Sequence, residues 1–374
     1  MDRRWGMALL WLVSCGRTPL EGDTLASASG RASGSDDATH DDGNSYDGPS
    51  IPDDDDDGAD VGGGELPPPD DPVPDFGSQL PPATCAMAPP LPAGPSCADA
   101  PARQLLELEG WNATSIVDDD RIYVAVTFWE SSFYRIDKCT GDVELLGPAG
   151  MNPAELAIVD DRLLWTDYIN PGYLWEMPKH GGDAVVIAEL TQPLALVVAG
   201  DWIFYSANEG LFRMPKAGGA SELFIGPERW YAYLTYDGAL LFGNEGIVPS
   251  VGWIDPSDGT YGGIPTLQQV GDVLADCEWI FWPDEYGRLQ RFSRATGTTE
   301  NLDLPIYRMT HDATHVFAST GESTLVAIDK GTGDAVVVAD LPGQLPWRST
   351  VDETHVYWTF ADSGDLWMAP KPPR

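Results

Sequence analysis

Basic residues are scarce in this chain. Its 374 residues include 21 Lys and Arg against 59 Asp and Glu, for a formal net charge of -38. Nucleic acids and anionic membrane surfaces attract proteins through a basic footprint. Because the repeated part of the chain is acidic as well as its N-terminal part, the sequence argues against both as partners.

Residues suited to catalysis or metal binding are also few. The chain has 5 His and 5 Cys, without His-rich or paired-cysteine metal spacing. It lacks a nucleophile elbow and a phosphate-binding glycine loop. His315 and His355 share one repeat position, within Thr-His-Val, for which we predict a structural turn role. We therefore expect no metal, no cofactor and no catalytic residue, and favour a protein that is not an enzyme.

Long apolar runs and sustained helical periods are missing too. The apolar run over residues 5–13 is too short to span a bilayer as a mature helix. With its basic start and the Leu-Val-Ser-Cys that follows, it resembles a bacterial lipoprotein signal, in which the cysteine, here Cys15, carries acyl chains after cleavage. An ordinary secretory signal with an incidental cysteine is the alternative. We predict a signal peptide over residues 1–15 and an exported, membrane-anchored lipoprotein; Gly16 resembles an outer-membrane rather than an inner-membrane address.

Residues 16–100 are acidic, rich in Gly, Pro and Ser, and poor in large apolar side chains. Such a segment buries too little apolar surface to offset its ordering entropy, so we predict a disordered tether. Asp53–Gly58 begins like a calcium-binding loop, but Gly64 stands where the bidentate acid belongs. A solvated acidic spacer is the favoured interpretation.

Cysteine placement fits an exported protein, in which disulfides are allowed. Cys85 and Cys97 flank a proline-rich loop at the end of the tether, and we predict a disulfide between them. Cys139 and Cys277 lie in different repeats, and we expect partly buried free thiols at both positions.

From about residue 101 to 374 the chain repeats one unit seven times, most clearly in Asp201–Gly219. A unit combines an acidic or glycine turn, an apolar β-run, a polar turn, and a second β-run that ends in a basic residue and a glycine turn. A period of about 40 residues with four short strands is typical of a β-propeller blade. The last unit supplies three strands, and residues 105–109 resemble the missing fourth. We predict an all-β fold, a seven-bladed β-propeller closed by an N-terminal outer strand.

The repeats also carry a family resemblance. Leu164-Trp165-Thr166-Asp167 and Tyr357-Trp358-Thr359 resemble the YWTD repeat of low-density-lipoprotein-receptor propellers. The whole unit is similar to the repeats of lipoprotein propellers of myxobacteria and related bacteria. Receptor propellers have six blades, whereas this chain has seven units. The resemblance implies a fold and a compartment but no reaction.

Propeller topology assigns the loops to two faces. Turns between second and third strands share one end with the connections between blades, here called the top face, and the other turns form the bottom face. We predict a top face with acids and aromatics and a bottom face with basic residues at one repeat position, which Pro256 interrupts. The alternative is that the acids and amides are ordinary turn residues and the lysines are solvated. The candidate binding residues on the top face are Trp129, Glu130, Asp167, Tyr168, Asn170, Asn208, Glu209, Glu228, Arg229, Trp230, Tyr231, Asn244, Glu245, Asp284, Glu285, Tyr286, Arg308 and Trp347.

These observations favour a monomeric, lipid-anchored binding or scaffold module of the cell envelope. Its partner would be an unknown protein, peptide or glycan, and it would contact the membrane only through the lipid. One alternative is a propeller enzyme, a hydrolase or lyase acting on a polysaccharide or peptide at the top of the central channel. The other is a purely structural envelope protein.

Overall fold

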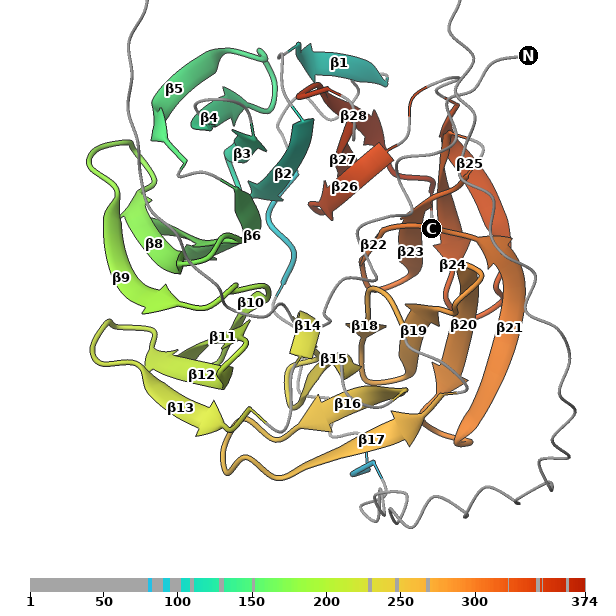
Figure 1. Cartoon of the computed structure of the whole chain (residues 1–374). Coiled ribbons are helices and arrows are strands. Elements are labelled where there is room, and N and C mark those ends of the chain that lie inside the picture. The colour runs from blue at the N-terminus through green and yellow to red at the C-terminus, as the bar shows by residue number, and fades with distance from the viewer. Residues whose placement is uncertain are drawn as a thin grey trace, which may run out of the picture. The chain divides into compact units, whose positions relative to one another are not determined.

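Seven four-stranded antiparallel sheets surround a central axis in the computed structural model (Figure 1). The structure describes residues 80–82, 90–94, 102–107, 111–127, 131–149, 152–227, 231–245, 249–266, 270–321, 323–340, 344, 346–360 and 363–373. All of these belong to the second of two units of the chain, Pro69–Arg374. The predicted seven-bladed β-propeller is confirmed.

Each blade is built from consecutive strands. Blade 1 contains β2 (Trp111–Val117), β3 (Arg121–Thr127), β4 (Ser132–Asp137) and β5 (Val143–Pro148). Blade 2 contains β6 (Pro153–Val159), β7 (Arg162–Asp167), β8 (Gly172–Pro178) and β9 (Val185–Leu190). Blade 3 contains β10 (Leu196–Ala199), β11 (Trp202–Ala207), β12 (Gly210–Pro215) and β13 (Glu222–Ile225). Blade 4 contains β14 (Tyr231–Tyr236), β15 (Leu241–Glu245), β16 (Ser250–Ile254) and β17 (Tyr261–Pro265). Blade 5 contains β18 (Leu274–Ala275), β19 (Trp279–Pro283), β20 (Arg288–Ser293) and β21 (Thr298–Pro305). Blade 6 contains β22 (Met309–His311), β23 (His315–Ser319), β24 (Thr324–Asp329) and β25 (Ala335–Asp340). Blade 7 contains β26 (Pro346–Val351), β27 (His355–Phe360), β28 (Leu366–Pro370) and, from the start of the chain, β1 (Arg103–Leu106).

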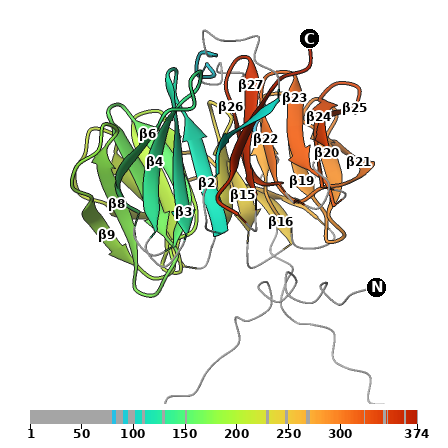
Figure 2. The same cartoon turned by 90° about the horizontal axis from the view of Figure 1, so that it is seen from above.

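Burial follows the position of a strand within its blade. The second strands β23 and β27 are buried along their whole length, because each blade packs between two others and both of its faces are covered. The outer strand β21 is mostly exposed. Figure 2 shows the blades from the side, with their strands running roughly along the axis. The middle strands therefore have continuous runs of apolar residues, whereas the outer strands expose many of their side chains to water.

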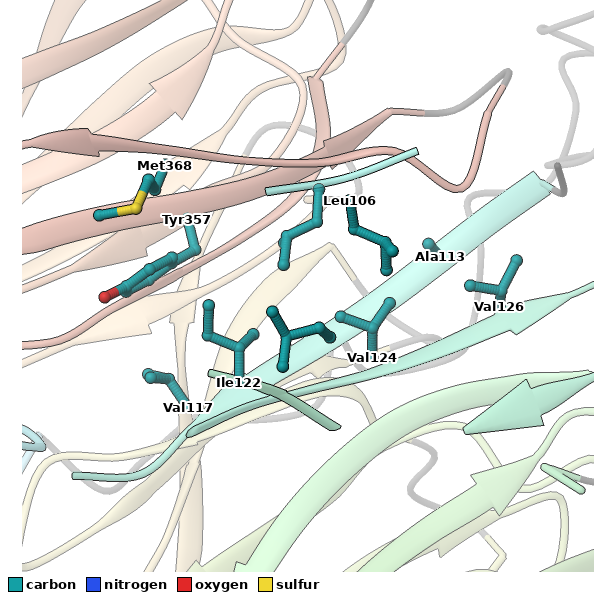
Figure 3. Packing of buried hydrophobic residues seen from close by; sticks show 10 residues of the cluster. Leu106, Ala113, Val117, Ile122, Val124, Val126, Tyr357 and Met368 are labelled. Atoms are coloured by element: carbon teal, nitrogen blue, oxygen red, sulfur yellow. The ribbon is translucent and has the colours of Figure 1, made fainter. Parts of the chain in front are cut away.

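The ring closes where the first blade meets the last. β1 pairs antiparallel with β28, which completes blade 7 with a strand from the other end of the chain. Figure 3 shows the closing interface, in which Ile122 and Val124 of blade 1 point toward Tyr357 and Met368 of blade 7 and Leu106 of β1. The predicted N-terminal closing strand is confirmed, although it begins two residues earlier than the sequence suggests.

Ion pairs join neighbouring blades at the bottom face. In each pair the base follows the third strand of one blade, and the aspartate follows the first strand of the preceding blade. The nitrogen-to-oxygen distances are 2.5 to 3.2 Å, in Lys138–Asp352, Lys179–Asp118, Lys216–Asp160, Arg294–Asp237, Lys330–Asp276 and Lys371–Asp312. The predicted basic bottom face, and its alternative of solvated lysines, are wrong at every position but Lys216, whose pair stays largely exposed.

These aspartates also fix their own turns. Oδ1 of Asp352 accepts hydrogen bonds from the backbone N–H groups of Thr354 and His355, both at 2.8 Å, while Oδ2 accepts one from Lys138 Nζ at 2.9 Å. Asp312 holds His315 in the same way, at 2.7 Å. One carboxylate therefore shapes a turn and joins two blades. The two histidines are the first residues of β23 and β27, directly after these bottom turns.

Where the series breaks, both partners of the ion pair are absent. Pro256 stands in blade 4 at the position of the base, and Gly200 stands in blade 3 at the position of the aspartate. Arg213 fills the junction instead: its guanidinium lies 4.3 Å from the ring centroids of Trp202 and Phe224, and Nη1 donates to the Pro256 carbonyl at 3.4 Å. A single unpaired buried charge is costly, whereas losing both partners is not.

Residues ahead of the blades pack against the propeller. Leu80 contacts the apolar cluster of blades 4 and 5, and Leu91 contacts that of blades 6 and 7. The Ala93 N–H donates to Asp119 Oδ1 at 2.8 Å, and its carbonyl accepts a hydrogen bond from Lys138 Nζ at 2.8 Å. The predicted disordered tether therefore does not extend through residues 80–82 and 90–94.

Cysteine chemistry differs from the prediction at one position. Cys139 is disulfide-bonded, so the expected free thiol is wrong there. Cys15, Cys85, Cys97 and Asp53–Gly58 lie outside the described residues, and the lipid, disulfide and calcium predictions made on them stay predictions.

Candidate functional site

The predicted top-face residues fall into three groups. Some lie outside the described part of the chain, namely Trp129, Glu130, Glu228, Arg229 and Trp230. Others are buried inside or between blades. The rest lie at the surface or around the mouth of the central channel, and these are the residues that form a candidate site.

Two of the predicted acids are buried. Asp167 and Glu245 are each 1% exposed. Asp167 Oδ1 accepts the Asn152 N–H at 2.7 Å, and Glu245 Oε2 accepts the Ser250 hydroxyl at 2.8 Å. Asn244 is buried as well, and its amide donates to the Val270 carbonyl on the way to the next blade. An acidic ring that includes Asp167 and Glu245 is therefore wrong, because these carboxylates serve the blades internally.

Tyr231 also belongs to the core. It is fully buried at the start of β14, and its ring covers two glycines of blade 4. A Cβ at Gly252 would lie 2.6 Å from Tyr231 Cε1, and one at Gly243 would lie 3.5 Å from Cδ1. Gly252 therefore needs to be glycine for the ring to lie there, whereas the ring only comes into ordinary contact with Gly243.

Asn208 and Glu209 are exposed in the top turn of blade 3. The Glu209 carboxylate accepts the Thr191 N–H at 3.1 and 3.2 Å, and the Asn208 amide donates to Gln192 Oε1 at 3.0 Å. These bonds tie the turn to the connection from blade 2. The side chains stay at the surface, with part of their hydrogen-bonding capacity used locally.

In blade 2 the top turn contains Tyr168, which is half-buried, and Asn170, which is exposed. The Tyr168 carbonyl accepts a hydrogen bond from the Asn152 side chain at 3.1 Å. Asn170 precedes a cis peptide bond to Pro171. This turn lies apart from the convergent cluster described next.

Side chains from four consecutive blades meet around Arg308. This residue lies in the connection between β21 and β22, and Nη1 donates to Asp272 Oδ1 at 2.6 Å. Its guanidinium lies 4.9 Å from the ring centroid of Tyr233 on β14 and 4.7 Å from that of Trp347 on β26. The first strands of the blades surround the central axis in Figure 1. The four residues lie in or just before the starts of β14, β18, β22 and β26, and we call them the mouth cluster.

The mouth cluster is held in a fixed charge state and geometry. Burial acts to lower the pKa of Arg308, but Asp272 and Tyr233 outweigh it and raise that pKa. The arginine is therefore always charged. Tyr233 has a φ of 56° at a register shift between β14 and β15, a left-handed conformation that costs about 1–3 kcal/mol for a non-glycine residue. Such strain is concentrated at functional sites.

A second ion pair spans the same end of the channel. Arg348 of β26 in blade 7 reaches past blade 1, and its Nη2 lies 2.7 Å from Glu155 Oε1 on β6 of blade 2. Both side chains keep about a quarter of their surface exposed, at 22% and 24%. The channel mouth therefore offers aromatic rings and neutralised ion pairs rather than a net charge.

Blade 5 provides the remaining surface residues. Asp284 is half-buried, and Glu285 and Tyr286 are exposed, with Tyr286 74% exposed. Tyr307, just before Arg308, is 54% exposed. The connection between β21 and β22 thus leads from blade 5 to the mouth cluster, with Tyr307 exposed at the surface and Arg308 inside the cluster.

Sequence reasoning found Arg308 and Trp347 as residues of the connections between blades, but it missed their partners Tyr233 and Asp272. Aligning the starts of the seven first strands would have flagged both, since these positions share the channel mouth. Within the described ranges, no group of three His, Cys, Asp or Glu side chains is arranged to hold a metal ion. Those ranges likewise hold no helix long and apolar enough to cross a membrane.

Comparison with known proteins shows similarity in fold only. No protein-family model matches the sequence, and no curated protein matches it. BamB from Moraxella catarrhalis is similar in structure, with 15% identity, a TM-score of 0.52, and coverage of 74% of this chain and 99% of that one. YCF48 from Cyanidioschyzon merolae has 10% identity, a TM-score of 0.57, and coverage of 72% and 99%.

An enzyme shares the fold as well. A catalytically inactive virginiamycin B lyase from Staphylococcus aureus, solved with quinupristin, has 11% identity and a TM-score of 0.57, covering 72% of this chain and 99% of that one. Identities this low carry no activity across, because one propeller scaffold hosts unrelated functions.

Proposed function

We propose that this chain is a lipid-anchored binding or scaffold module of the cell envelope, which holds a protein, peptide or glycan partner on its top face. The observation that carries the proposal is the mouth cluster. Arg308 stacks between Tyr233 and Trp347 and is paired with Asp272, which gives a rigid, amphipathic surface of the kind that anchors partners.

The bottom face is less suited to binding a partner than the top face. Its bases are neutralised by neighbouring blades, and Lys138 is 1% exposed. Residues 90–94 contact the same face through Ala93. The bases at this repeat position are therefore largely taken up by pairing between blades.

Affinity capture from envelope extract tests the binding function. The purified full chain is immobilised beside two variants, Trp347→Ala in the mouth cluster and Lys216→Ala in the exposed bottom pair. We expect a specific molecule to be retained by the wild type and Lys216→Ala but lost with Trp347→Ala, all three having matched melting curves. Equal retention by Trp347→Ala, or no retention above an empty support, would refute the proposal.

The anchor is tested separately. Labelled palmitate should enter the wild-type chain in cells but not the Cys15→Ser variant, which should leave the membrane fraction. A chain that is processed, unlabelled and released without its first residues would instead show an ordinary secretory signal.

A further inference from the structure

The top turn of blade 5 presents an exposed aromatic ring on a rigid support. Asp284 Oδ1 accepts the N–H groups of Tyr286 and Arg288, both at 2.9 Å, and the Asp284 carbonyl accepts the Gly287 N–H at 2.9 Å. Gly287 has a φ of 72°, which suits glycine. The backbone that carries the ring is therefore fixed before any ligand arrives.

A shallow depression lies beside this ring. It is lined by Tyr286, Arg288, Asp303 and Pro305. Arg288 and Pro305 are cross-strand partners, and Arg288 forms an ion pair with Asp303. Asp303 has a φ of 55° next to a register shift in the β20–β21 pairing, so a strained backbone holds its carboxylate against the arginine.

We propose that this depression binds a neutral oligosaccharide, a ligand class that deepens the proposed function and rests on it. The exposed face of Tyr286 can pack against the C–H face of a sugar ring. The Arg288–Asp303 pair places planar donors beside planar acceptors, as neighbouring hydroxyl groups require. Pro305 supplies an apolar rim.

A second ring extends the surface beyond one sugar. Tyr307 is 54% exposed and lies over Gly321, where a Cβ would come within 3.3 Å of the ring. It follows Pro305 by two residues on the connection that leads to the mouth cluster. The Ile306 N–H donates to the Gly287 carbonyl at 2.6 Å, so the two exposed rings lie on neighbouring segments, which suits a chain of sugars better than a single one.

Local charge argues against other ligands. Glu285 adds a negative charge, and Arg288 is already neutralised by Asp303, which disfavours anionic glycans. Asp284 offers little to a cationic peptide, because its Oδ1 caps the turn and its Oδ2 accepts the Gln290 side chain at 3.0 Å, which leaves the single charge of Glu285. The depression is open and half polar, so it lacks the enclosed apolar pocket that anchors a peptide side chain.

The test is binding of the purified full chain to an array of neutral and sulfated oligosaccharides and to hexalysine, followed by calorimetry with the best neutral glycan. We expect neutral glycans to bind, Tyr286→Ala to weaken the best of them by at least about tenfold, and Tyr286→Phe to stay close to wild type. Tyr261→Ala, at an exposed tyrosine on the outer strand of blade 4, should bind like the wild type.

The inference is overturned if no neutral glycan binds, if sulfated glycans or hexalysine bind better, or if Tyr286→Ala binds as tightly as Tyr286→Phe. Tyr286 is exposed, so its truncation leaves folding intact. Envelope capture that depends on Trp347 but not on Tyr286 would leave the binding function standing and refute the glycan site. No retention by the wild type above an empty support, together with no binding of any neutral glycan, would refute both.

Discussion

Lys138→Met is expected to destabilise the propeller strongly, because it breaks a buried pair at the junction that closes the ring. Lys138 and Asp352 have side chains 1% and 0% exposed, and they join blade 1 to blade 7 at 2.9 Å. Methionine keeps most of the side-chain volume but leaves the Asp352 carboxylate without its cation. The Ala93 carbonyl also loses its hydrogen bond from Nζ.

The size of the loss follows from what stays around the carboxylate. Removing one partner of a buried pair costs about 3–5 kcal/mol. Asp352 keeps the Tyr357 hydroxyl at 2.7 Å and two backbone N–H groups, which places the expected value near the lower end, about 3 kcal/mol. Urea unfolding followed by tryptophan fluorescence at neutral pH, with disulfides intact, measures it.

Two variants make the experiment decisive. Lys216→Met removes the equivalent pair where the side chains are 36% and 70% exposed, and should cost less than about 1 kcal/mol. Adding Asp352→Asn to Lys138→Met should recover part of the loss, as the joint absence at Gly200 and Pro256 implies. Equal, small effects of Lys138→Met and Lys216→Met would refute the ion-pair account of blade cohesion.

Three further predictions concern acid, cysteine and closure. Burial raises the pKa of Asp312, but Lys371 and backbone N–H groups outweigh it and lower that pKa to about 2. The ionised carboxylate should therefore contribute about 2 kcal/mol to the free energy of unfolding above pH 4, and this contribution should be lost as pH falls toward 2. Asp312→Asn should flatten this decline when stability is measured in an acid titration. Peptide mapping without reduction should find Cys139 joined to Cys97, in place of the Cys85–Cys97 bond predicted from the sequence, because residues 90–94 contact blade 1 at Lys138. A peptide that joins Cys85 to Cys97, or one that joins Cys139 to another cysteine, would contradict this. Deleting β1 should lower the melting temperature in one cooperative step, since it opens blade 7, and unchanged melting would contradict closure.

The repeat made the architecture predictable from sequence. Polar turns interrupt apolar runs at a constant spacing, so the apolar β-run of the clearest unit, Asp201–Gly219, appears as β11, Trp202–Ala207. The closing strand followed from a missing fourth strand in the last unit. The ordered contacts of Leu80 and Leu91 were not predictable, because isolated leucines in a Pro- and Asp-rich segment carry no period.

Side-chain partners between blades were harder to foresee. Lys138 and Asp352 are 214 residues apart, and a single unit shows only a lysine in a turn. The joint loss of Gly200 and Pro256 was a signal in the sequence, visible only once blades are known to be neighbours. Likewise Glu245 resembled a surface turn acid, but Ser250 across the hairpin satisfies it inside the blade.

The mouth cluster was half predictable. Arg308 and Trp347 were predicted as residues of the connections between blades, whereas Tyr233 and Asp272 resemble ordinary strand and turn residues. Their convergence depends on first strands that share one axis, which only the closed ring provides.

Hydroxyl-radical footprinting of the full chain, with and without the partner captured from envelope extract, tests the central claim most directly. It reads the oxidation rate of each aromatic side chain. We predict that binding protects Trp347 and Tyr307 on the top face and leaves Tyr261 on the outer strand of blade 4 unchanged. Protection of Tyr261 or of the bottom turns, with Trp347 and Tyr307 unaffected, would contradict a binding function at the top of the propeller.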